Sequence, residues 1–190
     1  MGADVSQLAD PRRGHFDLGT GFHGDLWLDL DAMFLRPGLL RPLARRVADR
    51  LGPYRAAAVC GPLTGGAFLA LMVAEELGAA FLPASPDPGE AGRWQLPAAA
   101  RERFGGCPVV VVDDAINAGT AVLASCQAIR DAGARPAAVA ALLALGQART
   151  FVAGTLGLPF HALASLPSQV WPAGNCSLCS GGIRLEPPAG

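Results

Sequence analysis

Residues 108–114, PVVVVDD, restrict the possible fold more than any other segment of the chain. Four consecutive valines are typical of a strand that is buried on both faces, and two aspartates follow them directly. Such strands occur in parallel sheets whose two faces are covered by helices. The segment therefore predicts the central strand of an α/β fold.

Other apolar runs alternate with helical patterns along the rest of the chain. Residues 37–51 carry apolar side chains at helical spacing between arginines, with Pro37 and Gly52 at the two ends. Thr64 is expected to cap a second helix. We expect further strands at 56–60, 79–83, 137–145 and 160–166, and further helices at 64–77, 119–132 and 147–156. This alternation predicts a doubly wound parallel sheet with a small hood formed by the two terminal segments.

A length of 190 residues suits one α/β domain, so we expect residues 1–190 to form a single domain. Within it we expect an N-terminal segment at 15–36, a core at 37–166 and an extended tail at 167–190. Residues 84–107 are rich in Pro, Gly and Ala, which predicts a flexible loop.

Composition excludes several classes of partner. A formal net charge of −1 offers no general electrostatic attraction to nucleic acid or to an anionic membrane. Proline, glycine or charge interrupts every apolar run before about 18 residues, the minimum for a membrane span. No secretory signal is recognisable near the start, which favours a cytoplasmic protein. The chain contains no lysine, so lysine Schiff-base chemistry is excluded.

The end of the central strand has the residue types of a ligand site. Asp113 and Asp114 should emerge at the carboxyl end of the sheet, where open α/β sheets bind their ligands. The small residues from Ala115 to Thr120 leave backbone amides and a helix N-terminus free to hold an anion. Two carboxylates beside an amide-lined cradle predict a ribose 5-phosphate site, in which the acids bind sugar hydroxyls and can organise Mg²⁺.

Four segments together resemble one enzyme family. Residues 113–120, DDAINAGT, resemble the phosphoribosyl diphosphate (PRPP) signature of type I phosphoribosyltransferases, and especially the DDxITAGT variant of orotate phosphoribosyltransferases. Residues 18–29, LGTGFHGDLWLD, look like the segment of these enzymes that approaches the base. CGPLTGG at 60–66 is similar to their GPxxGG pyrophosphate loop, and 171–188 is similar to the WxPxxCPLCxxGxPLxxP tail of one branch.

The resemblance implies transfer of a phosphoribosyl group from PRPP to a nitrogen base, with orotate as the first candidate, in pyrimidine biosynthesis. Pyrophosphate would leave with Mg²⁺ bound to the diphosphate. Residues 84–107 would close over the site, which in this family is often the site of the neighbouring subunit, so the resemblance implies a homodimer.

The resemblance also assigns roles to individual residues. Asp113 and Asp114 would fix the ribose, and together with Arg93 they are the catalytic candidates. The ribose and 5-phosphate site would comprise Asp113, Asp114, Ala115, Ile116, Asn117, Ala118, Gly119, Thr120 and Ala121. The pyrophosphate loop would comprise Gly61, Pro62, Leu63, Thr64, Gly65 and Gly66. The base would contact Thr20, Gly21, Asn117 and Gln147.

The sequence departs from the family pattern where the base and the leaving group bind. The lysines of the family's loop are absent, so Arg93, and after it Arg101 or Arg103, must supply positive charge there. Asn117 stands where the family has threonine. Gln147 stands where the family has an arginine for the orotate carboxylate, and glutamine cannot make that bidentate contact. Two alternatives therefore stay open: a phosphoribosyltransferase for another base, and a non-catalytic PRPP- or nucleotide-binding protein.

Several other residues allow a structural or a functional interpretation. Cys176 and Cys179 have the spacing of half a zinc knuckle, but the sequence has no second CxxC or CxxH motif. We therefore expect a plain turn and no metal site, and the alternative that stays open is a structural zinc ion with ligands from another chain. His15 is expected to be structural, while His23 and Trp27 lie either near the base or in surface and core positions.

Overall fold

The computed structural model describes residue 5, residues 9–18 and residues 21–187 of the chain. Within these ranges, six strands form the main sheet in the order β5-β4-β3-β6-β7-β8. Their bounds are β3 Ala58–Pro62, β4 Ala80–Pro86, β5 Trp94–Gln95, β6 Pro108–Ile116, β7 Arg135–Leu145 and β8 Phe160–Leu166. The strands pair in parallel except β5, which pairs antiparallel with β4 at the edge. The prediction of a doubly wound parallel sheet is confirmed.

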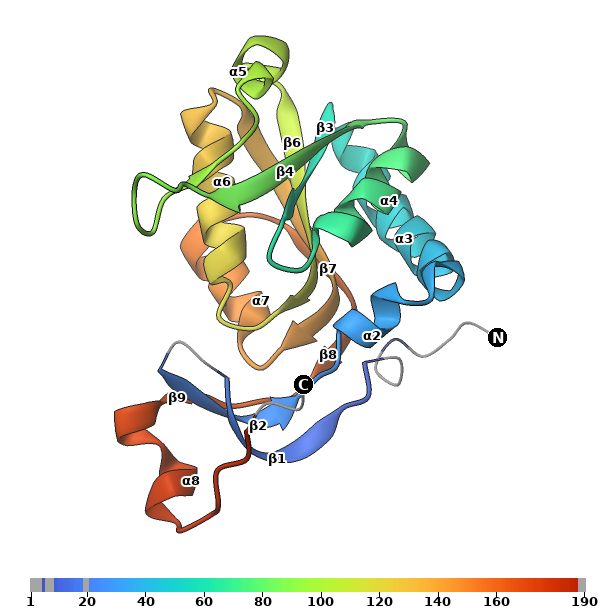
Figure 1. The fold of residues 1–190 in the computed structure, drawn as a ribbon. Helices are drawn as coiled ribbons and strands as arrows, with labels where there is room; N and C mark the ends of the chain where they lie inside the picture. The colour runs from blue at the N-terminus through green and yellow to red at the C-terminus, as the bar shows by residue number, and fades with distance from the viewer. Residues whose placement is uncertain (1–4, 6–8, 19–20, 188–190) are drawn as a thin grey trace.

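Helices cover both faces of this sheet (Figure 1). On one face lie α3 (Pro37–Leu51) and α4 (Ala67–Leu77), and on the other lie α6 (Thr120–Asp131) and α7 (Ala148–Phe151), which continues as a π-helical turn, η2 (Val152–Leu156). The valines of β6 alternate between these faces: Val110 and Val112 pack in the core below α3 and α4, and Val109 and Val111 in the core below α6. The central strand is thus buried on both sides.

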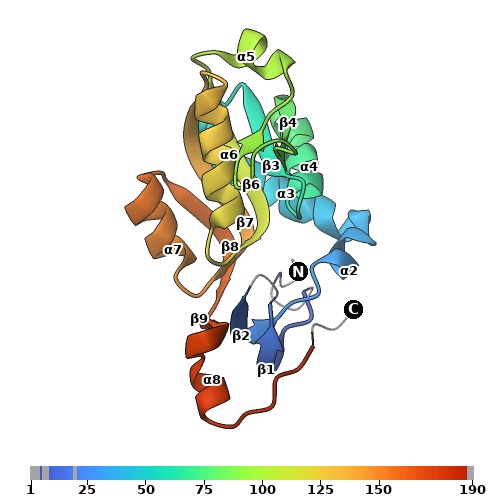
Figure 2. The ribbon, with the colours of Figure 1, turned by 60° about the vertical axis from the view of Figure 1, so that its left-hand side comes forward.

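A smaller sheet forms the hood across the carboxyl ends of the main strands (Figure 2). It consists of β1 (Arg12–Asp17), β2 (Phe22–Trp27) and β9 (Val170–Pro172), in that order. The chain then forms η3 (Ala173–Asn175) and α8 (Ser177–Ser180), and returns beside β1, where the amide of Glu186 donates to the carbonyl of His15. Both terminal segments therefore contribute to one unit, the hood, at the carboxyl ends of the main strands.

Three short elements complete the described chain. These are α2 (Asp31–Phe34), η1 (Gly52–Tyr54) and α5 (Ala99–Phe104). In the described residues, no helix combines the length and apolar character that crossing a membrane requires.

The predicted helix at 37–51 matches α3, and the predicted strand at 160–166 matches β8. The prediction that Thr64 caps the second helix is wrong, because α4 begins at Ala67 after Gly66 and has no side-chain cap. Residues 63–66 instead form a turn against the aspartates of β6.

Two segments expected to lack regular structure are partly regular. The segment 84–107 contains β5 and α5, and the tail 167–190 contains β9 and α8. The two strands among these elements, β5 and β9, have one physical cause. Proline and glycine weaken the local periodicity that sequence patterns detect, but pairing with a distant strand supplies backbone hydrogen bonds regardless of that periodicity.

Candidate active site

The central strand β6 places two adjacent acids at the carboxyl end of the sheet. Asp113 and Asp114 are each 6% exposed. A carboxylate oxygen of Asp113 accepts the amide hydrogen of Asp114 at 3.0 Å, and one of Asp114 accepts that of Ala115 at 2.6 Å. These short-range hydrogen bonds hold the two carboxylates in fixed orientations.

Burial raises the pKa of both acids. The pKa of Asp113 lies well above its ordinary value, first because of desolvation and then because of the neighbouring Asp114 charge, against which backbone hydrogen bonds from Asp114 and Gly66 act. The pKa of Asp114 is also raised, again chiefly by desolvation. No arginine forms an ion pair with either acid in the described part of the chain. The pair therefore favours a proton, a hydroxyl donor or a cation as its partner.

The turn after β3 lies directly against these acids. A Cβ added at Gly65 would lie 3.0 Å from a carboxylate oxygen of Asp114, and one at Gly66 would lie 2.4 Å from a carboxylate oxygen of Asp113. Gly61 is equally constrained, because a Cβ there would lie 2.4 Å from that of Ala70. Only glycine permits this approach, so the structure joins the predicted pyrophosphate loop to the predicted ribose acids.

The turn between β6 and α6 ends at Gly119, which has a φ of +74°. A Cβ at this position would lie 2.3 Å from the ring of Phe151, so both the backbone and the space require glycine. Helix α6 begins at the next residue, Thr120, and has no side-chain cap. Its first amides are therefore free to donate to an anion.

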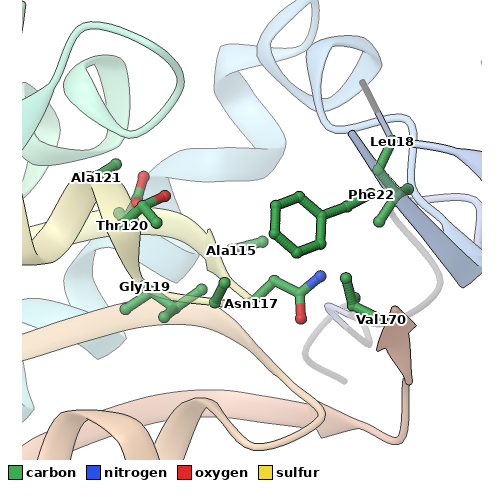
Figure 3. A pocket seen from close by; sticks show the side chains of 11 residues that line it. Leu18, Phe22, Ala115, Asn117, Gly119, Thr120, Ala121 and Val170 are labelled. Carbon is green, nitrogen blue, oxygen red and sulfur yellow. The ribbon is translucent and has the colours of Figure 1, made fainter. Parts of the chain in front are cut away.

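A cavity of about 300 Å³ opens beside this turn (Figure 3). It is lined by Leu18, Phe22, Asp113, Ala115, Ile116, Asn117, Ala118, Gly119, Thr120, Ala121 and Val170. Thr120 and Ala121 lie at one end, and Phe22 and Val170 at the other. The whole predicted phosphate segment and Asp113 thus border one hollow, whereas Asp114 lies beneath the glycine turn.

The hood supplies one wall of the cavity, through three residues that the sequence analysis did not name individually. Leu18 follows β1, Phe22 begins β2 and Val170 begins β9, and all three are far from β6 in the sequence. The Phe22 side chain is 44% exposed and its ring faces the side chains of Ala115 and Asn117 (Figure 3). The available signal was an aromatic residue directly after the sequence Gly-Thr-Gly, but the direction of its side chain depends on how the hood docks on the main sheet.

The candidate base contacts have different positions. Asn117 lines the cavity. Gly21 is exposed in the turn before β2 and is not part of the cavity lining, and Thr20 lies outside the described residues. Gln147 follows β7, is exposed, and accepts a hydrogen bond from the Thr150 hydroxyl at 3.3 Å. Of the predicted set, Asn117 alone borders the cavity in the described structure.

Arg93 lies far from the cavity of its own chain. Its guanidinium is 2.9 Å from Glu90 and 3.9 Å from Asp131, the last residue of α6. The cavity is at the first residue of α6, and eleven helical rises of 1.5 Å separate the two ends by about 16 Å. The guanidinium of Arg101 also donates to the backbone oxygen of Asp131. In this arrangement Arg93 does not reach the cavity of its own chain.

Two other candidates near the base also lie elsewhere. His23 is 8% exposed and contacts Cys179 in the hood, with 3.3 Å between its Nδ1 and the sulfur. Trp27 lies at the far end of β2, where its ring centroid is 6.3 Å from that of Phe16. Neither residue lines the cavity. Of the two interpretations of Trp27, the structure agrees with packing against other side chains rather than with a place near the base.

Comparison with known proteins gives the class and then the family. No family model matches the chain. The fold is similar to orotate phosphoribosyltransferase of Aeropyrum pernix, with a TM-score of 0.68 at 23% identity over 85% of this chain and 91% of that one. It is also similar to adenine phosphoribosyltransferase of Thermoanaerobacter pseudethanolicus, with a TM-score of 0.65 at 18% identity over 85% and 98%. The molecule therefore has the fold of type I phosphoribosyltransferases.

The sequence defines the family more closely. The chain is 30% identical to orotate phosphoribosyltransferase of Thermus thermophilus over 176 residues, which cover 91% of each chain. It is 28% identical to the same enzyme of Caldanaerobacter subterraneus over 177 residues, 93% of this chain and 88% of the relative. The chain belongs to the orotate phosphoribosyltransferase family.

Proposed function

We propose that the protein transfers a phosphoribosyl group from PRPP to a nitrogen base, with orotate as the first candidate, and releases pyrophosphate. The observation that carries this proposal is the meeting of Asp113 and Asp114 with a glycine turn and an uncapped helix N-terminus around one hollow. In the reaction, the C1–oxygen bond of the sugar breaks, pyrophosphate leaves with the electron pair, and the base nitrogen bonds to C1 and gives up its proton.

The 5-phosphate binds at the turn from Asn117 to Ala121. The first amides of α6 point their hydrogens toward this end of the cavity, and the helix dipole favours an anion there. The Thr120 hydroxyl adds a further donor. These groups bind the phosphate without any lysine, which agrees with the composition of the chain.

The ribose binds against the paired acids. Asp113 borders the cavity, and its carboxyl accepts hydrogen bonds from sugar hydroxyls when ionised and donates one when protonated. Because its pKa is raised, sugar hydroxyls that donate to it stabilise the ionised form. Binding of the sugar thereby relieves the cost of burying two adjacent charges.

Residues 61–66 hold the pyrophosphate, and the donor set around them fits a magnesium ion. A side chain at Gly65 or Gly66 would not fit between the turn and the carboxylates of Asp113 and Asp114. In the described residues, neither of these buried carboxylates forms an ion pair with an arginine. Carboxylates, waters and diphosphate oxygens are the ligands that Mg²⁺ prefers, and the ion would be held by Asp113, Asp114 and the substrate. When bound, Mg²⁺ neutralises charge on the diphosphate.

The base occupies the hood side of the cavity, between Phe22 and Asn117. An aromatic face and an amide suit a flat heterocycle with ring nitrogens and carbonyls. The described cavity lining contains no arginine, and Arg149 lies over the ring of Phe160 at 5.5 Å. This lining favours a second candidate, a phosphoribosyltransferase whose base carries no carboxylate.

The proposal includes a homodimer in the cytoplasm. Arg93 supports the dimer, because positive charge for the diphosphate is missing from the described lining of its own cavity and a partner's arm can supply it. Five free thiols support a reducing compartment.

The test is a turnover assay with PRPP, Mg²⁺ and one base at a time from orotate, uracil and the purines, with pyrophosphate release as the readout. Release with orotate supports the first candidate, and release only with an uncharged base supports the second. Background release with every base, together with PRPP binding in calorimetry, would make the protein a binding module. Absence of both release and binding would contradict the proposal.

A further inference from the structure

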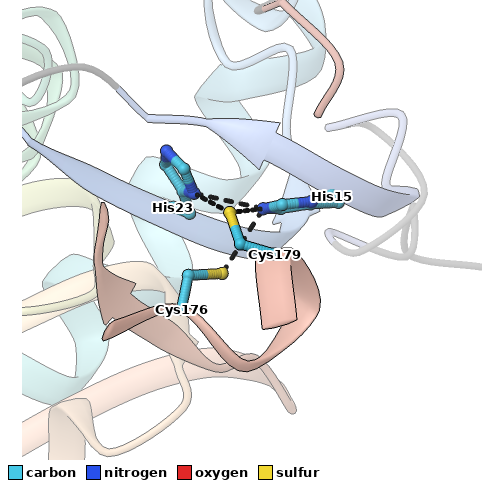
Figure 4. Close-up of side chains that lie close together, drawn as sticks. All are labelled: His15, His23, Cys176 and Cys179. Atoms are coloured by element: carbon cyan, nitrogen blue, oxygen red, sulfur yellow. Dashed lines mark hydrogen bonds between the residues drawn. The ribbon is translucent and has the colours of Figure 1, made fainter. Parts of the chain in front are cut away.

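Four side chains with metal-ligating atoms meet in the hood, away from the cavity. His15 comes from β1, His23 from β2, and Cys176 and Cys179 stand on either side of the start of α8 (Figure 4). One ligand atom from each lies within 4.8 Å of each of the others. His15, His23 and Cys176 are buried and Cys179 is exposed. Sequence spacing did not connect His15 with the other three residues, because they lie in segments that only the fold brings together.

Four of the six distances between these ligand atoms match the edges of a zinc tetrahedron, and all six are within 4.8 Å. Zinc–nitrogen bonds of about 2.05 Å and zinc–sulfur bonds of about 2.3 Å give edges of about 3.3 Å between nitrogens and about 3.6 Å between nitrogen and sulfur. Nε2 of His15 lies 3.1 Å from Nδ1 of His23, 3.4 Å from the Cys176 sulfur and 3.7 Å from the Cys179 sulfur. Nδ1 of His23 lies 3.3 Å from the Cys179 sulfur.

Hydrogen bonding orients one of the imidazoles for a cation. Nδ1 of His15 lies 2.8 Å from the carbonyl oxygen of Ile183. Because that oxygen only accepts, Nδ1 carries the hydrogen, and in the neutral ring the lone pair of Nε2 faces the cluster. Metal-ligating histidines typically donate their other ring hydrogen in this way.

The CxxC turn brings the two sulfurs to the same side of the backbone. The amide of Ser180 donates to the carbonyl of Cys176 at 3.1 Å, and that of Gly182 to the carbonyl of Cys179 at 3.0 Å. Gly182 has a φ of +70°, which ends the turn. Two thiolates and two imidazoles in a closed tetrahedral set select zinc over hard cations such as Mg²⁺, and they leave no position for a reacting water.

We propose that His15, His23, Cys176 and Cys179 bind one structural Zn²⁺ ion. The ion fastens the C-terminal tail to the N-terminal hairpin, in addition to the three residue pairs between β2 and β9 and the backbone hydrogen bonds of Glu186 beside β1. A sheet of this size buries little apolar surface, and small units of this kind commonly depend on a metal. Because Phe22 is adjacent to His23, the ion also fixes the wall of the cavity.

The first experiment measures zinc in the purified full-length chain by mass spectrometry, after dialysis against a weak competing chelator. The wild type is expected to retain one zinc per chain, and a Cys176→Ser, Cys179→Ser double variant to retain only background. Cys107→Ser is the matched control, because Cys107 is a free thiol outside the cluster, and it is expected to retain one zinc. Folded wild type without zinc, or equal zinc loss in the control, would overturn the proposal.

A second measurement on the wild type covers the case in which the double variant does not fold. Removing zinc with a strong chelator is expected to lower Tm by about 5–10 °C, and added Zn²⁺ but not Mg²⁺ is expected to restore it. Replacing zinc by Co²⁺ is expected to give the thiolate charge-transfer and intense visible bands of a tetrahedral ion. A Tm unaffected by chelator and the absence of these bands would contradict the site. A Cys176–Cys179 disulfide in the purified wild type would contradict it equally. These readouts do not depend on phosphoribosyl transfer.

Discussion

At the scale of single residues, Asp113 is held in an environment that disfavours its own charge. Its pKa is raised by burial and by Asp114, so the folded state prefers the protonated acid. Such a group contributes stability below its unfolded pKa, near 3.8, and that contribution is lost as the pH rises through the folded value. At neutral pH the charge of Asp113 therefore lowers the stability of the folded state, and the protein retains this charge for function.

Asp113→Asn is expected to raise Tm at pH 7 and to lower turnover by about 10²–10³-fold. The gain in Tm is expected to shrink as the pH falls toward 4, where the wild-type acid is itself protonated. Thermal unfolding at several pH values measures this. Asp49→Asn, at an exposed position on α3, is the control and is expected to change Tm little. A gain in Tm that is the same at pH 7 and near pH 4 would contradict burial of the charge as its cause.

Gly119 combines two separate demands, and Gly133 isolates one of them. Both have positive φ, +74° and +77°, but a Cβ at Gly119 meets Phe151 whereas one at Gly133 meets nothing within 4 Å. Gly133→Ala is expected to cost about 1–2 kcal/mol from the backbone alone. Gly119→Ala is expected to cost about 1–3 kcal/mol more, from overpacking. Urea denaturation measures both, and equal costs would contradict the steric contribution of Phe151.

At the scale of elements, the hood strand β2 determines what the cavity recognises. Phe22 and His23 are adjacent in this strand, so their side chains point to opposite faces of the hood sheet. Phe22 faces the cavity, while His23 faces the cysteines of the tail. One short strand therefore carries a substrate contact on one face and a candidate metal ligand on the other.

Phe22→Ala is expected to raise the KM for the base about tenfold and to leave the KM for PRPP nearly unchanged. The reason is that the ring contacts the end of the cavity opposite the phosphate turn. Steady-state kinetics with each substrate varied in turn measure the two constants. Phe68→Ala, which removes an exposed aromatic side chain of α4 outside the cavity, is expected to leave both unchanged. An equal rise in both constants for Phe22→Ala would argue against a base site there.

At the scale of the whole molecule, the arm formed by residues 84–107 carries Arg93 at a distance from the chain's own site. Arg93 pairs with Glu90 and with Asp131 at the distal end of α6. Both ion pairs are exposed and contribute little to stability. The arginine is thus available to leave these partners when a second subunit approaches.

Mixing Arg93→Ala and Asp113→Asn subunits tests whether the arginine acts across a dimer. Each variant alone is expected to be nearly inactive. After mixing by unfolding and refolding, half of the dimers are mixed and each has one complete site, so about a quarter of wild-type activity is expected. If Arg93 acted within its own subunit, the mixture would stay inactive.

Local patterns in the sequence were sufficient for the parallel strands of the main sheet and for the acidic turn. Four valines followed by two aspartates and a glycine turn predict β6, α6 and the ligand edge between them, because side-chain periodicity and turn chemistry act over a few residues. The helix at 37–51 was predictable for the same reason, because its apolar side chains recur at helical spacing. The strand limits moved where backbone pairing extended them, as in β7, which begins at Arg135 rather than at 137.

The meeting of distant segments depended on the tertiary structure alone. His15 and Cys176 are 161 positions apart, and nothing in either neighbourhood encodes their contact. The direction of Phe22 into the cavity and of Arg93 away from it has the same origin. Such contacts follow from how the hood and the arm dock on the main sheet, and docking is decided by summed packing over many residues rather than by any short pattern.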